Sequence, residues 1–202
     1  MKRAGEFWIP DAEISQEAAI ARGGAQVHHI AEAMKHVKRP RVAVDVGANV
    51  GTWTRVLGTL FDVVYAFEPA KDTFECLARN CPEAITIHAG LSDEPGMAQV
   101  MPDDKYPDGT GSRWLKPGGE VRLLTLDSFH LVPDLLKIDV EGMEYRVLKG
   151  AMETLLHKPV IVIEDKAKLC ERHGISPTAA WELLEAHGYR QVGKVGADRI
   201  YA

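Results

Sequence analysis

Residues 42–51 read Val-Ala-Val-Asp-Val-Gly-Ala-Asn-Val-Gly, an apolar run that meets an acid and then a loop with two glycines. A short, continuously apolar run is typical of a parallel strand that is buried on both faces. A glycine loop at the end of such a strand lets a ligand approach the backbone closely, in the crevice where open α/β sheets bind nucleotides. This stretch therefore predicts a site for a nucleotide-like cofactor.

Apolar runs of the same kind alternate with helical patterns along the rest of the chain. The alternation of strands and helices predicts an α/β fold with a parallel sheet and right-handed crossovers. Further strands are expected at residues 63–67, 85–88, 135–140, 160–163, 189–195 and 199–202. Helices are expected at residues 52–60, 72–80, 143–156 and 178–187.

The chain is expected to divide into an N-terminal cap and one larger domain. Residues 1–39 are predicted to form a helical cap, since residues 11–37 have a helical composition apart from a break at Gly23-Gly24. Residues 40–202 are predicted to form a single domain with an irregular insertion at residues 97–129, which is rich in proline and glycine. A long segment of this kind in a compact domain often carries function, so we expect it beside the binding pocket.

The composition is that of a soluble globular protein. The 202-residue chain is 46% hydrophobic and 26% charged, with a formal net charge of −5 that argues against a long nucleic acid as ligand. No run reaches the ~18 apolar residues that span a bilayer, and no apolar segment typical of a secretory signal follows residues 1–6. The three cysteines fit neither a disulfide framework nor a zinc site. We therefore expect a cytoplasmic enzyme without nucleic-acid or membrane partners.

The glycine loop matches neither of the two commonest nucleotide motifs. A P-loop is absent, and the dinucleotide fingerprint would need glycines where Asn49 and Thr52 stand. A cofactor that carries an amino acid in place of a pyrophosphate fits better. Asp45 could receive its ammonium group while N–H groups of the loop meet its carboxylate.

Two further acids follow the next two strands. Glu68 lies about twenty residues past Gly47, a spacing that places a carboxylate beside a ribose. Ser92 and Asp93 follow the third strand, where a polar side chain could meet an adenine edge. Three acids in order at three successive strand ends are far less common by chance than any one of them.

A charged strand completes the set. Residues 135–144 read Leu-Leu-Lys-Ile-Asp-Val-Glu-Gly-Met-Glu, so Lys137, Asp139 and Glu141 fall on one face of a strand by its period of two. Three charges on a central strand would be costly unless they face a cleft. We therefore predict that this face lines the reaction site.

Five motifs in this order resemble the FkbM family of S-adenosylmethionine-dependent methyltransferases. The resemblance covers roughly residues 40–165, and its most family-specific part is the charged strand. It implies a Rossmann-like class I methyltransferase fold: a seven-stranded, mostly parallel sheet with an antiparallel last strand and helices on both faces. The motifs are Val-Asp-Val-Gly-Ala-Asn-x-Gly, Phe-Glu-Pro, Leu-Ser-Asp, Thr-Leu-Asp (125–127) and Leu-Lys-Ile-Asp-Val-Glu-Gly-x-Glu.

The resemblance also implies an activity and a role for each motif residue. The family methylates hydroxyl groups, often on sugars or natural products, so the expected acceptor is a small molecule or glycan. By position, Glu68 would hold the cofactor's ribose, Ser92 and Asp93 would meet its adenine, and Asp139 would lie against the cofactor and, with Glu141, border the transfer site. The methionine portion would be held by Asp45, Gly47, Ala48, Asn49 and Gly51.

The chemistry asks for alignment of an acceptor oxygen with the activated methyl group and for removal of the hydroxyl proton. Asp139 or Glu141 is the candidate base, and Lys137 either lowers a neighbour's pKa or forms a structural ion pair. Asp139, Glu141, Glu164 and Asp165 could together ligate magnesium, but acids at strand ends are frequent without metal, and no metal site is expected.

Three other functions compete with this interpretation. An RNA 2′-hydroxyl methyltransferase would use lysine and aspartate groups such as Lys137, Asp139 and Lys166, but the chain lacks a basic stripe. A nicotinamide oxidoreductase conflicts with the fingerprint mismatch. A binding protein without catalysis would not need to keep the buried acids Asp139 and Glu141.

Overall fold

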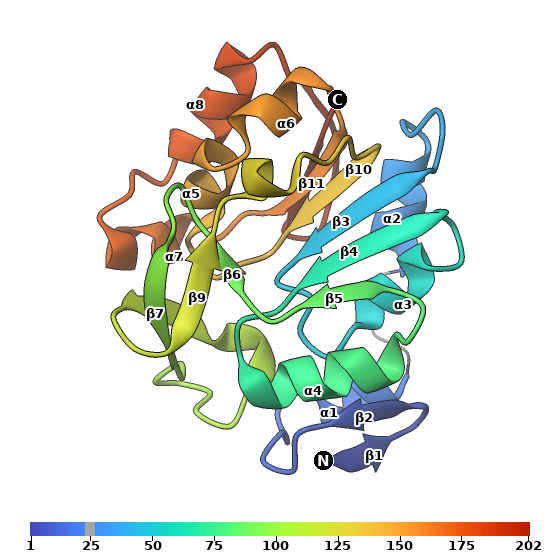
Figure 1. Ribbon diagram of the computed structural model, residues 1–202, viewed down its shortest axis with the longest axis vertical. Coiled ribbons are helices and arrows are strands. Elements are labelled where there is room, and N and C mark those ends of the chain that lie inside the picture. Colours follow the sequence, from blue (N-terminus) through green and yellow to red (C-terminus); the bar gives the residue numbers. More distant parts are fainter. Residues whose placement is uncertain (23–26) are drawn as a thin grey trace.

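A seven-stranded sheet forms the centre of the protein, and its strand order is β12-β13-β11-β10-β3-β4-β5 (Figure 1). The computed structural model describes residues 1–22 and 27–202, so the expected helix break at Gly23-Gly24 lies outside the described residues. Within this sheet only β13 runs antiparallel to its two neighbours, which confirms the predicted mostly parallel sheet with an antiparallel last strand. Its strands are β3 (Val42–Val46), β4 (Val63–Phe67), β5 (Ile85–Ile87), β10 (Leu135–Ile138), β11 (Val160–Glu164), β12 (Gln191–Val195) and β13 (Asp198–Tyr201).

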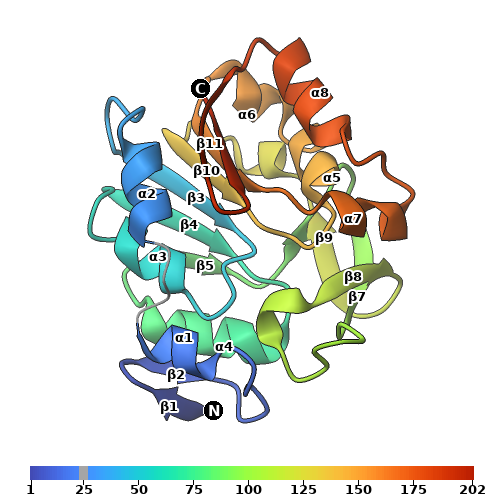
Figure 2. The ribbon, with the colours of Figure 1, turned by 180° about the vertical axis from the view of Figure 1, so that it is seen from behind.

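Helices cover both faces of this sheet, as predicted (Figures 1 and 2). On one face, Val44 and Leu136 pack with α5, α6 and α8, and on the other Ala43 and Leu135 pack with α2 and α3. Alternate residues of one strand thus serve two cores, which is why these strands are apolar throughout. The helices are α2 (Val27–Met34), α3 (Thr52–Leu57), α4 (Lys71–Asn80), α5 (Glu144–Lys149), α6 (Met152–Leu156), α7 (Ala167–Cys170) and α8 (Ala179–Ala186). None of the described helices is long and apolar enough to cross a bilayer.

The helix predicted over residues 143–156 is in fact two helices, α5 and α6. A side chain at Gly150 would collide with the backbone oxygen of Ser92, which passes directly against the glycine. The first helix thus ends at a glycine that admits another segment, a close approach that a helical period does not reveal.

The insertion at residues 97–129, expected to be irregular, is largely a second sheet. Its strand order is β6-β9-β7-β8, and β6 continues directly from the edge of the large sheet. Short strands punctuated by proline and glycine leave little period-two signal, so the prediction of an irregular segment was wrong except at residues 121–126, whose apolar run indicates a strand and which contain β9. The strands are β6 (Gly90–Leu91), β7 (Gly96–Met101), β8 (Trp114–Pro117) and β9 (Val121–Leu124), and two 3₁₀ helices accompany them, η1 (Thr110–Ser112) and η2 (Leu126–Phe129).

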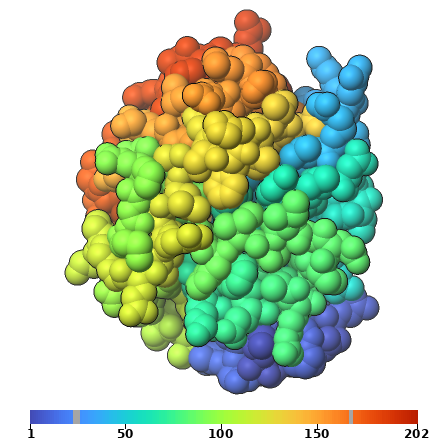
Figure 3. Space-filling view, in the orientation of Figure 1, coloured from blue at the N-terminus to red at the C-terminus, as the bar shows by residue number. Residues whose placement is uncertain are grey.

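The N-terminal segment begins with a hairpin rather than a helix. Strands β1 (Lys2–Ala4) and β2 (Phe7–Ile9) pair antiparallel, and α1 (Glu17–Ala21) follows. The hairpin packs on α4, at the bottom of the space-filling view (Figure 3). Helices α1 and α2 lie in the stretch predicted to be helical, but α2 packs on the large sheet, and residues 2–9 form a hairpin in place of a helix.

Candidate active site

A cavity of about 250 Å³ opens at the carboxyl ends of β3, β4 and β10. Parallel strands bring their carboxyl ends to one edge of a sheet, which is where α/β folds bind ligands. The cavity wall includes Gly47, Ala48, Asn49, Glu68, Lys137, Asp139 and Glu141. Seven predicted site residues therefore meet in one place.

The glycine loop has the left-handed backbone that its sequence suggests. Gly47, Asn49 and Gly51 have φ angles of +79°, +52° and +92°. A Cβ at Gly47 would collide with the carbonyl oxygen of Asp139, and a Cβ at Gly51 would lie 2.6 Å from the Cys81 sulfur. The two glycines thus let the loop lie directly against the segment after β10 and against α4.

The N–H groups of this loop are used within the protein. Those of Gly47 and Ala48 both donate to the carbonyl of Phe67, and that of Asn49 donates to the Glu68 carboxylate at 2.8 Å. The N–H of Gly51 donates to Ala48. These four N–H groups are therefore engaged within the protein, and a contact of the loop with a ligand carboxylate stays a prediction.

Glu68 lies directly after β4 and lines the cavity. The residue is 7% exposed. It accepts hydrogen bonds from the N–H groups of Asn49 and Ala70 and from the Thr73 hydroxyl, each 2.8 Å long. Burial raises the pKa of Glu68 above its ordinary value, against the lowering effect of these bonds. Three fixed donors hold the carboxylate in one orientation, as recognition of a diol requires.

Replacing Glu68 with alanine is expected to weaken cofactor binding by about 1–3 kcal/mol, because it removes acceptors for two hydroxyl groups. Calorimetric titration with S-adenosylhomocysteine measures this. Glu75→Ala, an exposed acid on the same helix-bearing segment, is the matched control. Unchanged affinity in Glu68→Ala would remove Glu68 from the ribose site.

Asp45 and Lys137 form a buried ion pair beneath the loop. The Lys137 ammonium lies 3.0 Å from Asp45 Oδ1 and donates to the Gly47 carbonyl at 3.0 Å, while the Thr54 hydroxyl donates to Asp45 at 2.7 Å. Burial alone would lower the pKa of Lys137, but the two aspartates beside it, Asp45 and Asp139, raise it above its ordinary value. Asp45 is fully buried and does not line the cavity. Its expected partner, the cofactor's ammonium, is thus replaced by Lys137.

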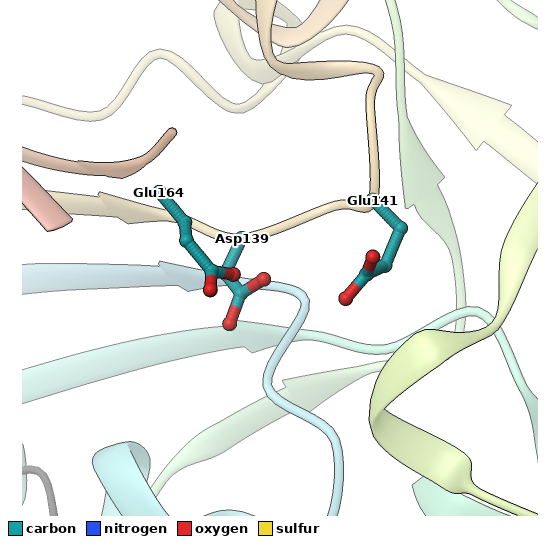
Figure 4. Close-up of side chains that lie close together, drawn as sticks. All are labelled: Asp139, Glu141 and Glu164. Carbon is teal, nitrogen blue, oxygen red and sulfur yellow. The ribbon is translucent and has the colours of Figure 1, made fainter. Parts of the chain in front are cut away.

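Asp139 and Glu164 come from the ends of adjacent strands, and their carboxyl groups lie side by side (Figure 4). Burial and the charge of Asp139 raise the pKa of Glu164 to about 9. Burial would also raise the pKa of Asp139, but Lys137, whose ammonium is 3.7 Å away, and the hydrogen bond with Glu164 hold it below its ordinary value. Glu164 therefore holds a proton more tightly than Asp139 does.

Glu141 approaches the same space from the loop after β10 (Figure 4). Its carboxylate lies 3.1 Å from the Lys166 ammonium, which also lies 3.2 Å from Glu164. Burial raises the pKa of Glu141 to about 7 although Lys166 lowers it. Glu141 also has a left-handed φ of +55°, so its backbone is held in an uncommon conformation that turns the side chain toward the cavity.

Carboxylate oxygens of Asp139, Glu141 and Glu164 lie within 4.8 Å of one another, close enough for a shared cation. The two lysine ammonium groups already occupy this cluster as its counter-charges. Asp165, the fourth candidate ligand, pairs instead with Arg199 at 2.6 Å.

Ser92 and Asp93 lie outside the cavity wall. The Ser92 hydroxyl donates to Asp93, and Asp93 pairs with Arg146 at 3.2 Å. The wall at this level is made by Ala89, Gly90 and Leu91. Ser92 and Asp93 therefore do not line this cavity, and their contact with an adenine stays a prediction.

A cover over the cavity joins two segments that the sequence did not connect. The fully buried Glu13 accepts hydrogen bonds from the N–H groups of Thr110 at 2.6 Å and Gln16 at 2.8 Å. Gln16 and Thr110 both line the cavity, as does Arg113, which forms a bidentate pair with Asp72. No spacing pattern links residue 13 to residue 110, so sequence reasoning had no signal for this cover.

Three buried polar atoms on residues of the cavity wall have no partner among the described residues. They are Asn49 Oδ1, Trp53 Nε1 and Thr110 Oγ1. Unpaired buried polar groups cost free energy, and a bound polar ligand is one way to satisfy them. Together with the fixed Glu68 carboxylate, they fit a cofactor that has hydroxyl, ammonium and carboxylate groups.

A glycine loop after the first strand of the large sheet, an acid after the second and a buried carboxylate cluster after the fourth define a methyltransferase of the Rossmann-like class. The chain belongs to the FkbM methyltransferase family, because the model of the methyltransferase FkbM domain matches residues 45–191. It is also similar to the hexuronic acid methyltransferase AglP of Haloferax volcanii, with 30% identity over 98% of this chain and 83% of that protein.

Solved structures share the fold. A methyltransferase FkbM from Methylobacillus flagellatus superposes with a TM-score of 0.51 and 17% identity over 98% of this chain, which spans 56% of that structure. Precorrin 8w decarboxylase from Methanobacterium thermoautotrophicum superposes with a TM-score of 0.56 and 14% identity, over 100% of this chain and 99% of that structure. At these identities the likeness establishes the architecture alone. The chain is thus an S-adenosylmethionine-dependent methyltransferase by family.

Proposed function

We propose that this enzyme transfers a methyl group from S-adenosylmethionine to a hydroxyl of a sugar, with a hexuronic acid or a glycan that contains one as the acceptor. The observation that carries the proposal is the position of Glu141 in the same cavity as the glycine loop and Glu68. The relative named for a hexuronic acid supports the acceptor class.

Different residues of the cavity wall would contact different parts of the cofactor. Glu68 would accept from the ribose hydroxyls, Ala89 to Leu91 would flank the adenine, and the loop from Gly47 to Gly51 would face the methionine portion. The bound cofactor supplies an activated methyl group on sulfur. The protein's share is to align the acceptor oxygen with that group and to take its proton.

Of the two candidate bases, Glu141 suits the proton transfer better. A base works best when its pKa lies near the working pH; the pKa of Glu141 is about 7, whereas that of Asp139 lies below its ordinary value. As the acceptor oxygen bonds to the methyl carbon, the S–CH₃ bond breaks with its electron pair on sulfur, and the hydroxyl proton passes to the Glu141 carboxylate. Lys137 stays charged and holds Asp139 and the loop in place.

The cover adds the specificity. Gln16 on the N-terminal segment and Thr110 in the insertion line the cavity opposite the strand ends. We propose that residues 1–39 and the insertion select the acceptor, while residues 40–202 form the catalytic domain. The three cysteines are unpaired and buried, as in proteins of reducing compartments, which supports a cytoplasmic location.

The rate should depend on pH through Glu141. Because the carboxylate must be ionised to accept a proton, kcat is expected to rise as the pH passes about 7 and to level off above it. Lys166→Met removes a cation that lowers the pKa of Glu141, so the rise should move to higher pH. Asp139 and Glu144 also face Glu141 and add to the shift. A pH profile of kcat that is identical in the variant would contradict this assignment.

The direct test is incubation of the protein and S-adenosylmethionine with glucuronate, galacturonate and their neutral counterparts, with S-adenosylhomocysteine as the readout. A hexuronic acid offers both hydroxyl and carboxylate oxygens, so the product is then treated with mild alkali. A methyl ether survives this treatment and a methyl ester does not. An alkali-labile product would overturn the hydroxyl assignment, and turnover of neutral sugars alone would overturn the hexuronic acid.

A further inference from the structure

A second cavity of about 660 Å³ adjoins the active site. It lies between the small sheet (β7 and β8), the start of α5 and the 3₁₀ helix η3 (Glu171–His173). Leu115 and Met143 line both this cavity and the active-site cavity. The two spaces therefore share a wall, and a ligand that extends past these side chains would enter the second one.

The second cavity reaches close to the proposed base. His173 lines it, and the shared Met143 lies two residues after Glu141 in the chain. The Nε2 atom of His173 is buried without a partner among the described residues. Whatever fills the second cavity thus lies beside the end of the active site where the methyl group is transferred.

Apolar side chains dominate this cavity. Met97, Met101 and Leu123 form its floor with the shared Leu115 and Met143, and Trp114 stands beside them. Methionine side chains adapt to ligands of varied shape, and they are frequent at permissive apolar binding surfaces. This lining favours an apolar group over a further sugar ring, which would need several hydrogen-bonding partners.

The cations near this cavity are largely engaged elsewhere. Arg146 pairs with Asp93 at 3.2 Å, and Arg172 pairs with Asp103 at 3.1 Å and lies over the ring of Trp114. These two guanidinium groups therefore offer little to a second carboxylate, whereas Lys116, which also lines the cavity, is exposed and forms no ion pair among the described residues. The space is thus an apolar pocket with a polar rim that carries one exposed lysine.

We propose that the second cavity binds an apolar aglycone, so that the natural acceptor is a glycoside whose sugar is methylated in the active site while its apolar substituent occupies the neighbouring space. The proposal rests on the proposed function for the identity of the sugar, but not for the existence of the apolar subsite. It explains why the insertion forms a small sheet rather than a loose loop: β7 and β8 supply one wall of the subsite.

Binding to the protein saturated with S-adenosylhomocysteine tests this. 4-Methylumbelliferyl β-D-glucuronide is expected to bind at least about tenfold more tightly than glucuronate, the gain typical of burying one apolar group. The same gain is expected for 4-methylumbelliferyl β-D-glucoside over glucose. Calorimetry measures all four affinities without turnover.

Met97→Glu places a charge on the floor at a residue that is 47% exposed, so the fold should tolerate it. It is expected to abolish most of the tenfold gain. Leu156→Glu, at a site 72% exposed on α6, should leave the gain intact. The proposal is overturned if aryl glycosides and free sugars bind equally, if trigalacturonate binds more tightly than the aryl glucuronide, or if Met97→Glu keeps the full gain.

The two proposals fail separately. If both aryl glycosides show the gain but no sugar is methylated, the acceptor assignment is wrong and the apolar subsite stands. If glucuronate is methylated but the aryl group adds no affinity, the proposed function stands and the subsite is wrong.

Discussion

Glu141→Gln is expected to lower kcat by about 10²- to 10⁴-fold, the usual contribution of a general base. The amide is nearly the same size as the carboxylate, but it cannot take the hydroxyl proton. Affinity for S-adenosylhomocysteine should change little, because Glu141 borders the transfer site and not the ribose. Single-turnover methylation of the acceptor found in the sugar screen, with calorimetry of the cofactor product, measures both quantities.

Asp139→Asn and Glu144→Gln are the informative controls. Asp139 lies closer to Lys137 than Glu141 does. Burial also raises the pKa of Glu144 to about 7, but Glu144 accepts a hydrogen bond from the N–H of Gly142 and does not line the cavity. Glu144→Gln should retain most of the rate. If Asp139→Asn loses the chemistry and Glu141→Gln keeps it, Asp139 is the base and the present assignment is wrong.

Lys137→Met is expected to destabilise the fold by about 3–5 kcal/mol, the typical cost of leaving a buried charge without its partner. Asp45 is fully buried, and Lys137 is its cationic neighbour at 3.0 Å. Urea unfolding followed by circular dichroism measures the loss. The surface ion pair of Lys35 and Glu32 gives the matched control, since Lys35 is 63% exposed and Lys35→Met should cost no more than about 0.5 kcal/mol.

The double variant Asp45→Asn/Lys137→Met distinguishes an unpaired charge from lost packing. Removing both charges should recover part of the stability, because the buried carboxylate is no longer ionised without a partner. If the double variant is no more stable than Lys137→Met alone, the loss arises from contacts other than the ion pair, among them that of the Lys137 ammonium with the Trp53 ring.

The strand-end residues could be predicted from sequence because a parallel sheet gathers them by geometry alone. Glu68 and Asp139 lie 21 and 92 residues after Gly47, yet strand order brings all three to one cavity. The antiparallel last strand followed from the family resemblance. Apolar runs, helical spacing and the positions of glycine and proline were thus enough to predict the large sheet and the residues directly after its strands.

The rest depends on contacts between distant segments. Gly150 interrupts a helix because the backbone of Ser92 presses on it, and Glu13 bonds to Thr110, 97 residues away. Lys166 was noted only for a rival function, and its position between Glu141 and Glu164 follows from the antiparallel and parallel pairing around β11. Such neighbours leave no mark on local sequence patterns.

The shared proton on Glu164 sets the electrical balance of the reaction. When Glu141 is ionised, the carboxylates of Asp45, Asp139 and Glu141 face two ammonium groups, so the site carries one surplus negative charge that attracts the sulfonium of the cofactor. When Glu141 takes the acceptor's proton, that surplus disappears in the same event that turns the sulfonium into a neutral thioether. The attraction therefore ends with the reaction, and the neutral product S-adenosylhomocysteine can leave. Once Glu141 is ionised again, the site favours the charged S-adenosylmethionine over that product. The residues of this balance are Asp45, Lys137, Asp139, Glu141, Glu164 and Lys166.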